Sequence, residues 1–434
     1  MKMRKMFLAF ITYIIIFLGC KENPVVPPPL PQPVPKDTIT LSLEQVTQIS
    51  SSINVKSTIN NLNSLIRLFR VDNTSEKIIA EFNIKIRDTI IVDDNEGMGL
   101  QLNSIYNYYA IRIDTVGARK DSSNLLEVKT LDTTSFNYTW EEYTIGDNGS
   151  GLYGIWGTDA NNVYAVGEIH LNGKIYGALH YDGVSWIPMD STGGYSVWGF
   201  GPNDIWVAGG SVFHYDGLRW KQLDSYAIGN QRFPLDTVFF YNTNYRGIWG
   251  ANRNDVYFTS SLGRVVHWNG AKAELVFSRS GETLRDIDGY SKDFIVAVGV
   301  DFLPPSLTIY YDGQTWKDLQ NINNDYAINS VSIVNPKHIY FGGDGIFEWK
   351  QTGFSKIVST GYEVWDIAYN KQTGEIVACG VLDGIHIFNG TTWKSFKKQI
   401  TTDNSSFRGI FLQPTRIFCV GSSNSKAKII IGKK

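Results

Sequence analysis

The chain has 434 residues, a formal net charge of −2, and 43% hydrophobic and 13% aromatic residues. This length suffices for two or three domains, and the aromatic content favours β-sheets over helix bundles. The near-neutral charge lacks the basic patch typical of a nucleic-acid-binding domain, and three cysteines are too few for a disulfide scaffold. We therefore expect no nucleic acid among its partners.

The first residues have the pattern of an export signal. Basic residues precede an apolar run from Met6 to Leu18, which is too short to span a bilayer comfortably. The run ends at Gly19-Cys20, and this junction resembles the lipobox of bacterial lipoproteins, whose cysteine is acylated. The resemblance implies a signal peptide over 1–19, lipidation at Cys20, and an exported protein anchored in a membrane, at the outer membrane or cell surface or facing the periplasm. The alternative is an ordinary signal peptide or an uncleaved anchor.

A proline-rich segment follows the cysteine. The stretch "NPVVPPPLPQPVPK" holds half of the fourteen prolines of the chain. Such a stretch favours the extended polyproline II conformation, because proline has no N–H to donate to a sheet. Residues 20–36 are therefore expected to form the lipidated cysteine and a semi-rigid stalk.

Residues 37–133 contain no tryptophan, whereas all twelve tryptophans of the chain lie from Trp140 onwards. Within this region "SINVKST", "SLIRLFRVD", "KIIAEFNIKI" and "YNYYAIRIDTVG" alternate apolar and polar residues, as half-buried antiparallel strands do. The order resembles a fibronectin type III domain, with Tyr109, after Leu102 and before Ile111, in the place of the tyrosine corner. The resemblance implies an N-terminal β-sandwich that acts as a spacer.

Residues 134–434 contain a repeat. "GIWGTDANNVYAVG" followed by "ALHYDGVSW" recurs as "SVWGFGPNDIWVAG" followed by "VFHYDGLRW", and weaker copies continue towards the C-terminal end of the chain. The register of Trp156 recurs at Trp198, Trp249, Asp288, Ser332, Ala368 and Phe411. Units of about 40 to 45 residues with four short strands are typical of a β-propeller. Seven registers predict seven blades; a misread fifth or sixth copy would make six or eight.

Each part of the repeat has an expected place in a blade. "GIWG" forms the innermost strand, "HYDG" ends the third strand at a tight turn, and the outer strand opens at an aromatic residue: Trp186, Trp220, Trp316 or Trp393. The last copy has only three strands, so we expect the segment around Trp140 to supply the fourth and close the ring. The repeat resembles Asp-box and photosystem-assembly-factor-like propellers, and this resemblance bears on fold rather than function.

Several residues could be taken for catalytic or metal-binding groups. Asp182, Asp216 and Asp312 directly precede glycine, without the serine of a sialidase Asp-box, and no arginine triad accompanies them. His180, His214 and His267 share one register, but equivalent positions on packed sheets lie about 10 Å apart, too far to share a zinc ion. We expect these histidines to be packing residues, and we expect no metal or cofactor. Cys379 and Cys419 should point to opposite faces and remain free thiols.

One register position predicts a ligand site. Propeller ligands usually meet the face at which outer strands cross to the next inner strand. Two residues before the inner-strand Ile or Val, the copies place Tyr153, Tyr195, Arg246, Arg285, Asn329, Trp365 and Arg408. Aromatic faces and guanidinium groups suit sugar rings, acidic groups or peptides. We expect these seven residues to ring one entrance, with the insertion 223–245 over the same face. Alternatively, they simply cap the core.

The sequence thus predicts an all-β protein, with a β-sandwich before a seven-bladed propeller. We expect a non-catalytic binding module of the cell envelope or surface that takes a carbohydrate or protein ligand at the propeller mouth. One alternative is a glycan hydrolase or lyase using carboxylates among Asp236, Glu282, Asp286 and Asp301, although no pair stands out by its spacing. Another is a structural assembly factor of the envelope.

Overall fold

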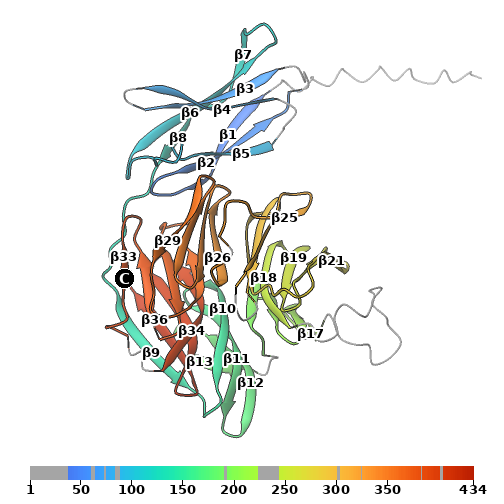
Figure 1. Cartoon of the computed structure of the whole chain (residues 1–434), viewed down its shortest axis with the longest axis vertical. Helices are drawn as coiled ribbons and strands as arrows, with labels where there is room; N and C mark the ends of the chain where they lie inside the picture. Colours follow the sequence, from blue (N-terminus) through green and yellow to red (C-terminus); the bar gives the residue numbers. More distant parts are fainter. Residues whose placement is uncertain are drawn as a thin grey trace, which may run out of the picture. The chain divides into compact units, whose positions relative to one another are not determined.

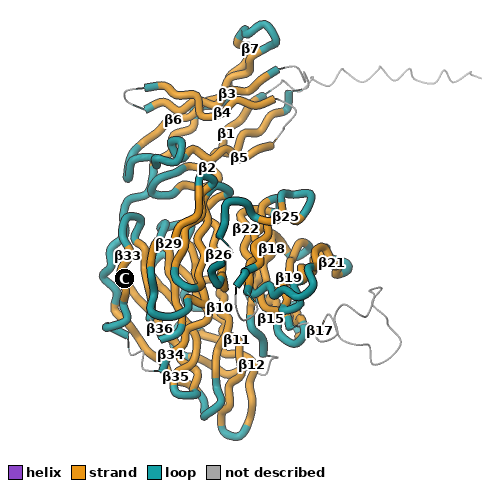
Figure 2. Tube along the Cα trace, viewed as in Figure 1, coloured by secondary structure: helices purple, strands orange, loops and turns teal. Residues whose placement is uncertain are grey.

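The computed structural model describes residues 38–434 except for 60–63, 73–74, 84–87, 190–192, 223–243, 301–303, 324, 383 and 401–403. The predicted signal peptide, Cys20, the proline-rich stalk and nearly all of the 223–245 insertion lie outside the described residues. The described part is built of strands and loops (Figure 2). It contains no apolar helix of membrane-spanning length.

The N-terminal strands form two sheets around a shared core (Figure 1). One sheet has the order β1 (Ile39–Val46), β2 (Ser51–Ser57) and β5 (Asp88–Asp93). The other has the order β4 (Glu76–Asn83), β3 (Leu65–Val71), β6 (Ile105–Ile113) and β7 (Arg119–Ser122), and β8 (Leu126–Lys129) also pairs with β6. Alternate residues of these strands, such as Ile53, Ile66 and Leu68, are fully buried between the sheets, which is the expected period of two.

The prediction that Tyr109 occupies the tyrosine corner is wrong. The hydroxyl of Tyr106 accepts a hydrogen bond of 3.0 Å from the backbone N–H of Gln101, and Tyr106 is buried. Tyr109 instead stacks on Phe69 outside the core. The two tyrosines are three residues apart, and in a strand an odd offset places side chains on opposite faces.

The later strands form seven four-stranded antiparallel sheets within the described part of the chain. The first four sheets are β10 (Gly151–Asp159), β11 (Asn162–Leu171), β12 (Lys174–Tyr181), β13 (Trp186–Met189); β14 (Ser196–Gly201), β15 (Asp204–Ala208), β16 (Val212–Tyr215), β17 (Trp220–Gln222); β18 (Tyr245–Asn252), β19 (Asp255–Ser260), β20 (Arg264–Trp268), β21 (Ala273–Ser278); and β22 (Asp286–Ser291), β23 (Phe294–Gly299), β24 (Leu307–Tyr311), β25 (Trp316–Asp318).

The remaining sheets are β26 (Ile328–Asn335), β27 (His338–Gly343), β28 (Ile346–Lys350), β29 (Gly353–Val358); β30 (Val364–Tyr369), β31 (Ile376–Gly380), β32 (Ile385–Phe388), β33 (Trp393–Ser395); and β34 (Ser405–Gln413), β35 (Arg416–Ser423), β36 (Lys426–Lys433), β9 (Thr139–Ile145). The first strand of each sheet contacts the first strand of the next, and β34 contacts β10. The sheets are therefore the blades of a closed β-propeller, and their number matches the seven repeats in the sequence.

The ring closes by the strand exchange that the sequence predicted. β9 precedes the first complete blade and pairs antiparallel with β36, the third strand of the last blade. Trp140 of β9 lies opposite Gly432, and its ring packs against Phe396 with the centroids 5.3 Å apart. Because β9 supplies the fourth strand of the last blade, β36 does not remain an unpaired sheet edge.

The turns and aromatic residues of the repeat also take the predicted places. In the first blade, Asp182 Oδ1 accepts hydrogen bonds from the backbone N–H groups of Val184 and Ser185, and Gly183 has a φ of +94°, in the region that favours glycine. The outer strand then begins at Trp186, whose ring packs on Tyr181 at 5.0 Å. The other three predicted tryptophans likewise begin outer strands: Trp220, Trp316 and Trp393.

The three histidines of the repeat have packing roles. The ring of His180 stacks on Tyr164, that of His214 on Trp206 and that of His267 on Tyr257, with centroids 4.1–4.5 Å apart. The Nε2 atom of each histidine is hydrogen-bonded to a side chain at the start of the second strand, namely Asn162, Asp204 and Asp255 respectively. Stacking and hydrogen bonding within one blade account for this residue type at this position.

The two described cysteines are free and buried, as predicted, but they do not point away from each other. Cys379 and Cys419 share one hydrophobic core, and burial together with the neighbouring Cys419 thiol raises the pKa of Cys379 well above its usual value. Neighbouring blades pack face to face, so side chains on opposite faces of adjacent sheets meet in the shared core. The sequence reasoning treated the sheets singly and therefore separated the thiols.

Candidate functional site: the mouth of the propeller

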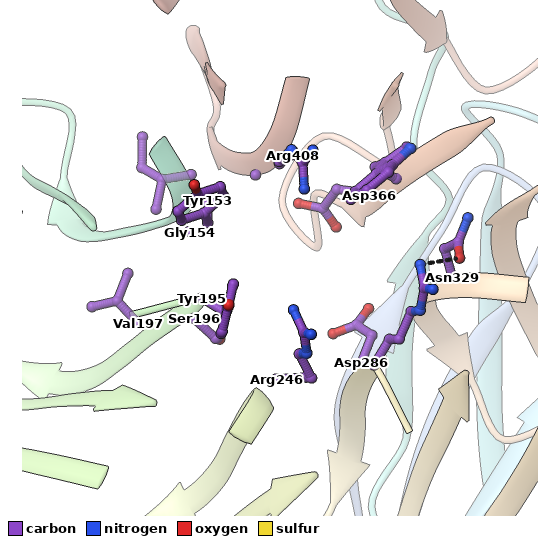
Figure 3. Close-up of a pocket in the computed structure, with 14 residues that line it drawn as sticks. Tyr153, Gly154, Tyr195, Ser196, Val197, Arg246, Asp286, Asn329, Asp366 and Arg408 are labelled. Carbon is purple, nitrogen blue, oxygen red and sulfur yellow. Dashed lines mark hydrogen bonds between the residues drawn. The ribbon is translucent and has the colours of Figure 1, made fainter. Parts of the chain in front are cut away.

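All seven residues of the predicted ring line one cavity of about 300 Å³ (Figure 3). Each lies within or just before the inner strand of its own blade: Tyr153, Tyr195, Arg246, Arg285, Asn329, Trp365 and Arg408. The repeat places equivalent residues at equivalent points around the axis, so seven residues distant in sequence converge at one opening. We call this cavity the mouth.

The next residue in each blade determines how closely the inner strands approach. Five blades have Gly or Ser at this position: Gly154, Ser196, Gly247, Ser330 and Gly409. A Cβ atom on Gly154 would lie only 2.8 Å from the backbone oxygen of Tyr195 in the next blade. Small residues are therefore needed wherever neighbouring inner strands pack backbone to backbone. The other two blades have aspartates, Asp286 and Asp366, and both line the mouth.

Aromatic rings of the mouth hold two of its arginines. The guanidinium carbon of Arg408 lies 3.8 Å from the centroid of the Trp365 ring and 5.5 Å from that of Tyr153. The guanidinium carbon of Arg246 lies 4.1 Å from the centroid of the Tyr195 ring. These are cation–π contacts, so one face of each ring is already covered by a cation.

The mouth concentrates positive charge. Burial lowers the pKa of Arg408, and the like charges of Arg246 and Arg285 lower it further, while the nearby Tyr153 acts in the opposite direction. Arg285 donates a hydrogen bond of 3.1 Å to Asn329 Oδ1. The Nε atoms of Arg246 and Arg408 are buried and have no hydrogen-bond partner within the described part of the chain. Three guanidinium groups thus share one partly buried space in which water screens them poorly.

The aspartates of the mouth connect neighbouring blades. Asp286 Oδ2 accepts a hydrogen bond of 2.9 Å from the backbone N–H of Val331, and Asp366 Oδ2 accepts one of 2.7 Å from that of Ile410. Burial raises the pKa of Asp286 to about 7 and raises that of Asp366 well above its usual value. Because these shifts favour the neutral form, the aspartates offset the charge of the arginines only in part near neutral pH.

The carboxylates considered for catalysis are not assembled into a pair. Asp286 lines the mouth, whereas Glu282 lines a different cavity with Ser261 and Arg264. Asp236 and Asp301 lie outside the described residues. No group of three or more metal-ligating side chains is present among the residues that the structure describes.

Sequence reasoning did not single out Asp366. The sequence did contain a signal for Asp366. Asp366 and Asp286 both directly follow one of the seven predicted mouth residues, at a position where the other blades have Gly or Ser. An aspartate at a position that otherwise requires a small residue indicates a specific hydrogen-bonding role there.

The fold and the mouth define this chain as a β-propeller with an arginine-rich axial opening. No family model matches the chain, and no curated protein matches its sequence. Among solved structures, that of YCF48 bound to D1 peptide is 16% identical and covers 70% of this chain and 100% of its own, with a TM-score of 0.52. The structure of YCF48 from Cyanidioschyzon merolae is 13% identical and covers 68% of this chain and 98% of its own, with a TM-score of 0.47. The first likeness shows the propeller fold, in agreement with the predicted resemblance to photosystem-assembly-factor-like propellers.

Proposed function

We propose that the chain is a non-catalytic binding protein of the cell envelope or surface, whose mouth holds a negatively charged segment of a protein partner. The observation that carries this proposal is the convergence of Arg246, Arg285 and Arg408 in one partly buried cavity. Bringing like charges together is unfavourable by itself, and a bound carboxylate would offset that cost.

The state of the aromatic rings favours an acidic ligand over a neutral sugar. Sugar recognition needs free aromatic faces, but Trp365 and Tyr195 each have a guanidinium over one face. We infer that the rings position the arginines. The guanidinium groups of Arg246 and Arg408 both line the mouth, and a carboxylate is their natural acceptor.

A peptide ligand is also supported by the solved structure of YCF48 with D1 peptide, a propeller of similar fold that takes a peptide. The rest of the chain fits a surface role. In this proposal the acyl group on Cys20 anchors the protein, and the proline-rich stalk and a fibronectin type III-like sandwich hold the propeller away from the membrane. The assembly-factor alternative is compatible with the same binding chemistry.

The test compares ligand classes on the full chain purified in detergent. The probes are fluorescent pools of ten-residue peptides rich in Asp and Glu, matched pools with Asn and Gln in their place, and an array of neutral and acidic glycans. We expect the acidic peptides to bind and the neutral ones to bind at least 10-fold more weakly. The double variant Arg246→Met with Arg408→Met should lose this binding, because each buried charge-assisted contact contributes roughly 2 kcal/mol or more.

The matched control is Arg279→Met, which removes an arginine that pairs with Asp318 outside the mouth. Equal binding by the wild type and the double variant would show that the mouth is not the site. Binding of acidic glycans without acidic peptides would replace the protein ligand by a carbohydrate one. Turnover of any glycan would make the chain an enzyme.

A further inference from the structure

A second cavity of about 410 Å³ adjoins the mouth. Tyr153 and Tyr195 line both cavities, and they lie together at one side of the mouth with their ring centroids 5.5 Å apart (Figure 3). From these tyrosines the second cavity extends between the first and second blades. Its other lining residues are Gly167, Glu168, Ile175, Tyr176, Gly177, Gly193, Gly194, Gly209 and Gly210. We call it the side cavity.

The side cavity and the mouth carry opposite charges. Among the described residues that line the side cavity, Glu168 alone is charged, whereas the mouth contains three arginines. The Glu168 side chain is 55% exposed, so a ligand can reach its carboxylate. The Nε2 atom of His170 lies 2.7 Å from Glu168 Oε1 and holds the carboxylate in place. A ligand that spans both cavities therefore meets guanidinium groups in one and a carboxylate in the other.

A β-bulge that distinguishes the first blade places Glu168 in this cavity. Val166 pairs with Ala178 and Ile169 pairs with Tyr176, so β11 has one residue more than β12 between these pairs. The extra length falls at Gly167 and Glu168. In the other six blades, the described second and third strands pair without a register shift. A bulge redirects the side chain that it carries, and here that side chain is the only carboxylate beside the tyrosines.

Glu168 shares a face of its sheet with the Tyr153 hydroxyl. Glu168 pairs with Gly151 of β10, and directly opposed residues of antiparallel strands point to the same face. A Cβ atom on Gly151 would lie 3.6 Å from the hydroxyl oxygen of Tyr153. Gly151 thus leaves room between Glu168 and Tyr153, at the boundary of the two cavities. The negative charge stands next to the mouth and on the β10 side of β11, away from the outer strand β13.

The lining favours one basic side chain over other cations. A metal ion needs several ligating oxygens, and no group of three metal-ligating side chains occurs among the described residues. A single carboxylate beside tyrosine hydroxyls suits an ammonium or guanidinium group. The Nζ atom of Lys174 lies 4.9 Å from the centroid of the Tyr176 ring, which covers one face of that ring. We therefore assign the attraction for a cation to Glu168 and not to the Tyr176 ring.

We propose that the side cavity binds a lysine or arginine side chain of the same ligand whose acidic residue occupies the mouth. The inference rests on the proposed function and describes the ligand more closely, as a protein segment with an acidic and a basic residue close together. The mouth takes the carboxylate, and Glu168 takes the cation through a charge-assisted hydrogen bond. Because each residue advances an extended chain by ~3.3 Å, we expect the two charges within about three residues of each other.

The first experiment starts from the acidic ten-residue peptide that binds the full chain most tightly. Each position other than the essential acidic residue is replaced in turn by lysine, norleucine or glutamate, and the dissociation constant is measured by fluorescence anisotropy. Norleucine has an apolar stem like that of lysine but no charge. At one or two positions near the acidic residue, lysine should bind about 3- to 5-fold more tightly than norleucine, the range of a partly exposed ion pair. Glutamate should bind more weakly than norleucine at the same positions.

The second experiment changes the charge of Glu168. Glu168→Gln should remove the advantage of lysine, and Glu168→Lys should reverse it, so that glutamate becomes the preferred residue. The control is Glu363→Lys, the same charge change at an exposed residue that directly precedes the inner strand β30 and lines neither cavity. This control should retain the preference for lysine. Both glutamates are exposed, so the variants should fold like the wild type, which thermal unfolding checks.

The outcomes separate this inference from the proposed function. If the arginine double variant loses binding but lysine gives no advantage at any position, or keeps its advantage in Glu168→Gln, the basic subsite is wrong and the mouth remains the site. If no peptide binds, or if the arginine double variant binds normally, the proposed function fails and the inference fails with it. A preference for lysine that disappears in Glu168→Gln and reverses in Glu168→Lys supports both.

Discussion

The guanidinium carbon of Arg408 lies 3.8 Å from the centroid of the Trp365 ring, so a residue of the seventh blade is held by an aromatic residue of the sixth. Trp365 directly precedes Asp366, which accepts a hydrogen bond from the backbone of Ile410, two residues after Arg408. The inner strands β30 and β34 thus position Arg408 in two ways: the Trp365 ring contacts its side chain, and Asp366 binds the backbone close to it.

This relationship predicts that Trp365 acts through Arg408. Trp365→Ala removes the surface on which the guanidinium rests, and we expect the affinity for an acidic peptide to fall about 3- to 10-fold, the range of one cation–π contact. Trp365→Phe keeps an aromatic face and should retain most of the affinity. Fluorescence anisotropy on the two variants checks this, and equal losses in both would contradict a role for the ring face.

The half-buried aspartates of the mouth predict a pH dependence of stability. Burial raises the pKa of Asp286 to about 7, so the folded state holds this proton more tightly than the unfolded state does. The contribution of Asp286 to stability is therefore greatest at low pH and is lost as the pH rises from about 4 to about 7. Asp286→Asn stays neutral, and its melting temperature relative to wild type should rise by about 3 °C between pH 5 and pH 8.

The control for this experiment is an aspartate shifted in the opposite direction. The ion pair with Lys317, together with the backbone N–H groups of Thr315 and Gln314, lowers the pKa of Asp312 to about 2. Its contribution to stability is lost only as the pH falls from about 4 to about 2. Asp312→Asn should therefore differ from wild type by the same amount at pH 5 and pH 8. A similar pH trend in both variants would show that Asp286 is not the titrating group.

Ring closure predicts a sensitive glycine. A Cβ atom on Gly432 would lie 2.6 Å from the Trp140 ring, which is wedged against Phe396. Gly432→Ala should destabilise the protein by about 1–3 kcal/mol, the usual cost of overpacking a core. Gly353 on β29 has open space around its Cβ position, so Gly353→Ala is the matched control and should be near neutral. Urea unfolding measures both variants, and equal stabilities would mean that the β9–β36 contact does not hold the ring.

The proposed lipid anchor predicts where the protein is found. Cys20→Ala removes the proposed acylation site. Because the acyl chains would then no longer hold the protein at the membrane, the chain should move from the membrane fraction to the soluble fraction. Cys379→Ala removes a buried thiol instead and should leave the protein in the membrane fraction. Immunoblots of the two fractions decide between them, and continued membrane retention of Cys20→Ala would favour an uncleaved hydrophobic anchor.

The sequence predicted the propeller and the seven residues of its mouth because every blade solves the same packing problem. Once Trp156 and its equivalents set the register, residues at one offset must lie at one end of the ring. The sequence was less able to predict which side chains of neighbouring blades contact each other. Cys379 and Cys419 show this, since their meeting depends on how two sheets face each other and not on the register within either sheet.

One further feature needed coordinates for a similar reason. Tyr106 and Tyr109 both lie on an alternating strand, and only the position of the core distinguishes them.

The pairing of β9 with β36 also constrains how the protein is made. Glu141 and Lys433, which form an ion pair across these strands, are 292 residues apart in sequence. The ribosome therefore releases β9 long before β36 is synthesised. Until then the last blade is incomplete and the ring of blades cannot close. Contacts between residues so far apart in sequence form slowly. The propeller ring can therefore close only after β36 has been synthesised and has paired with β9.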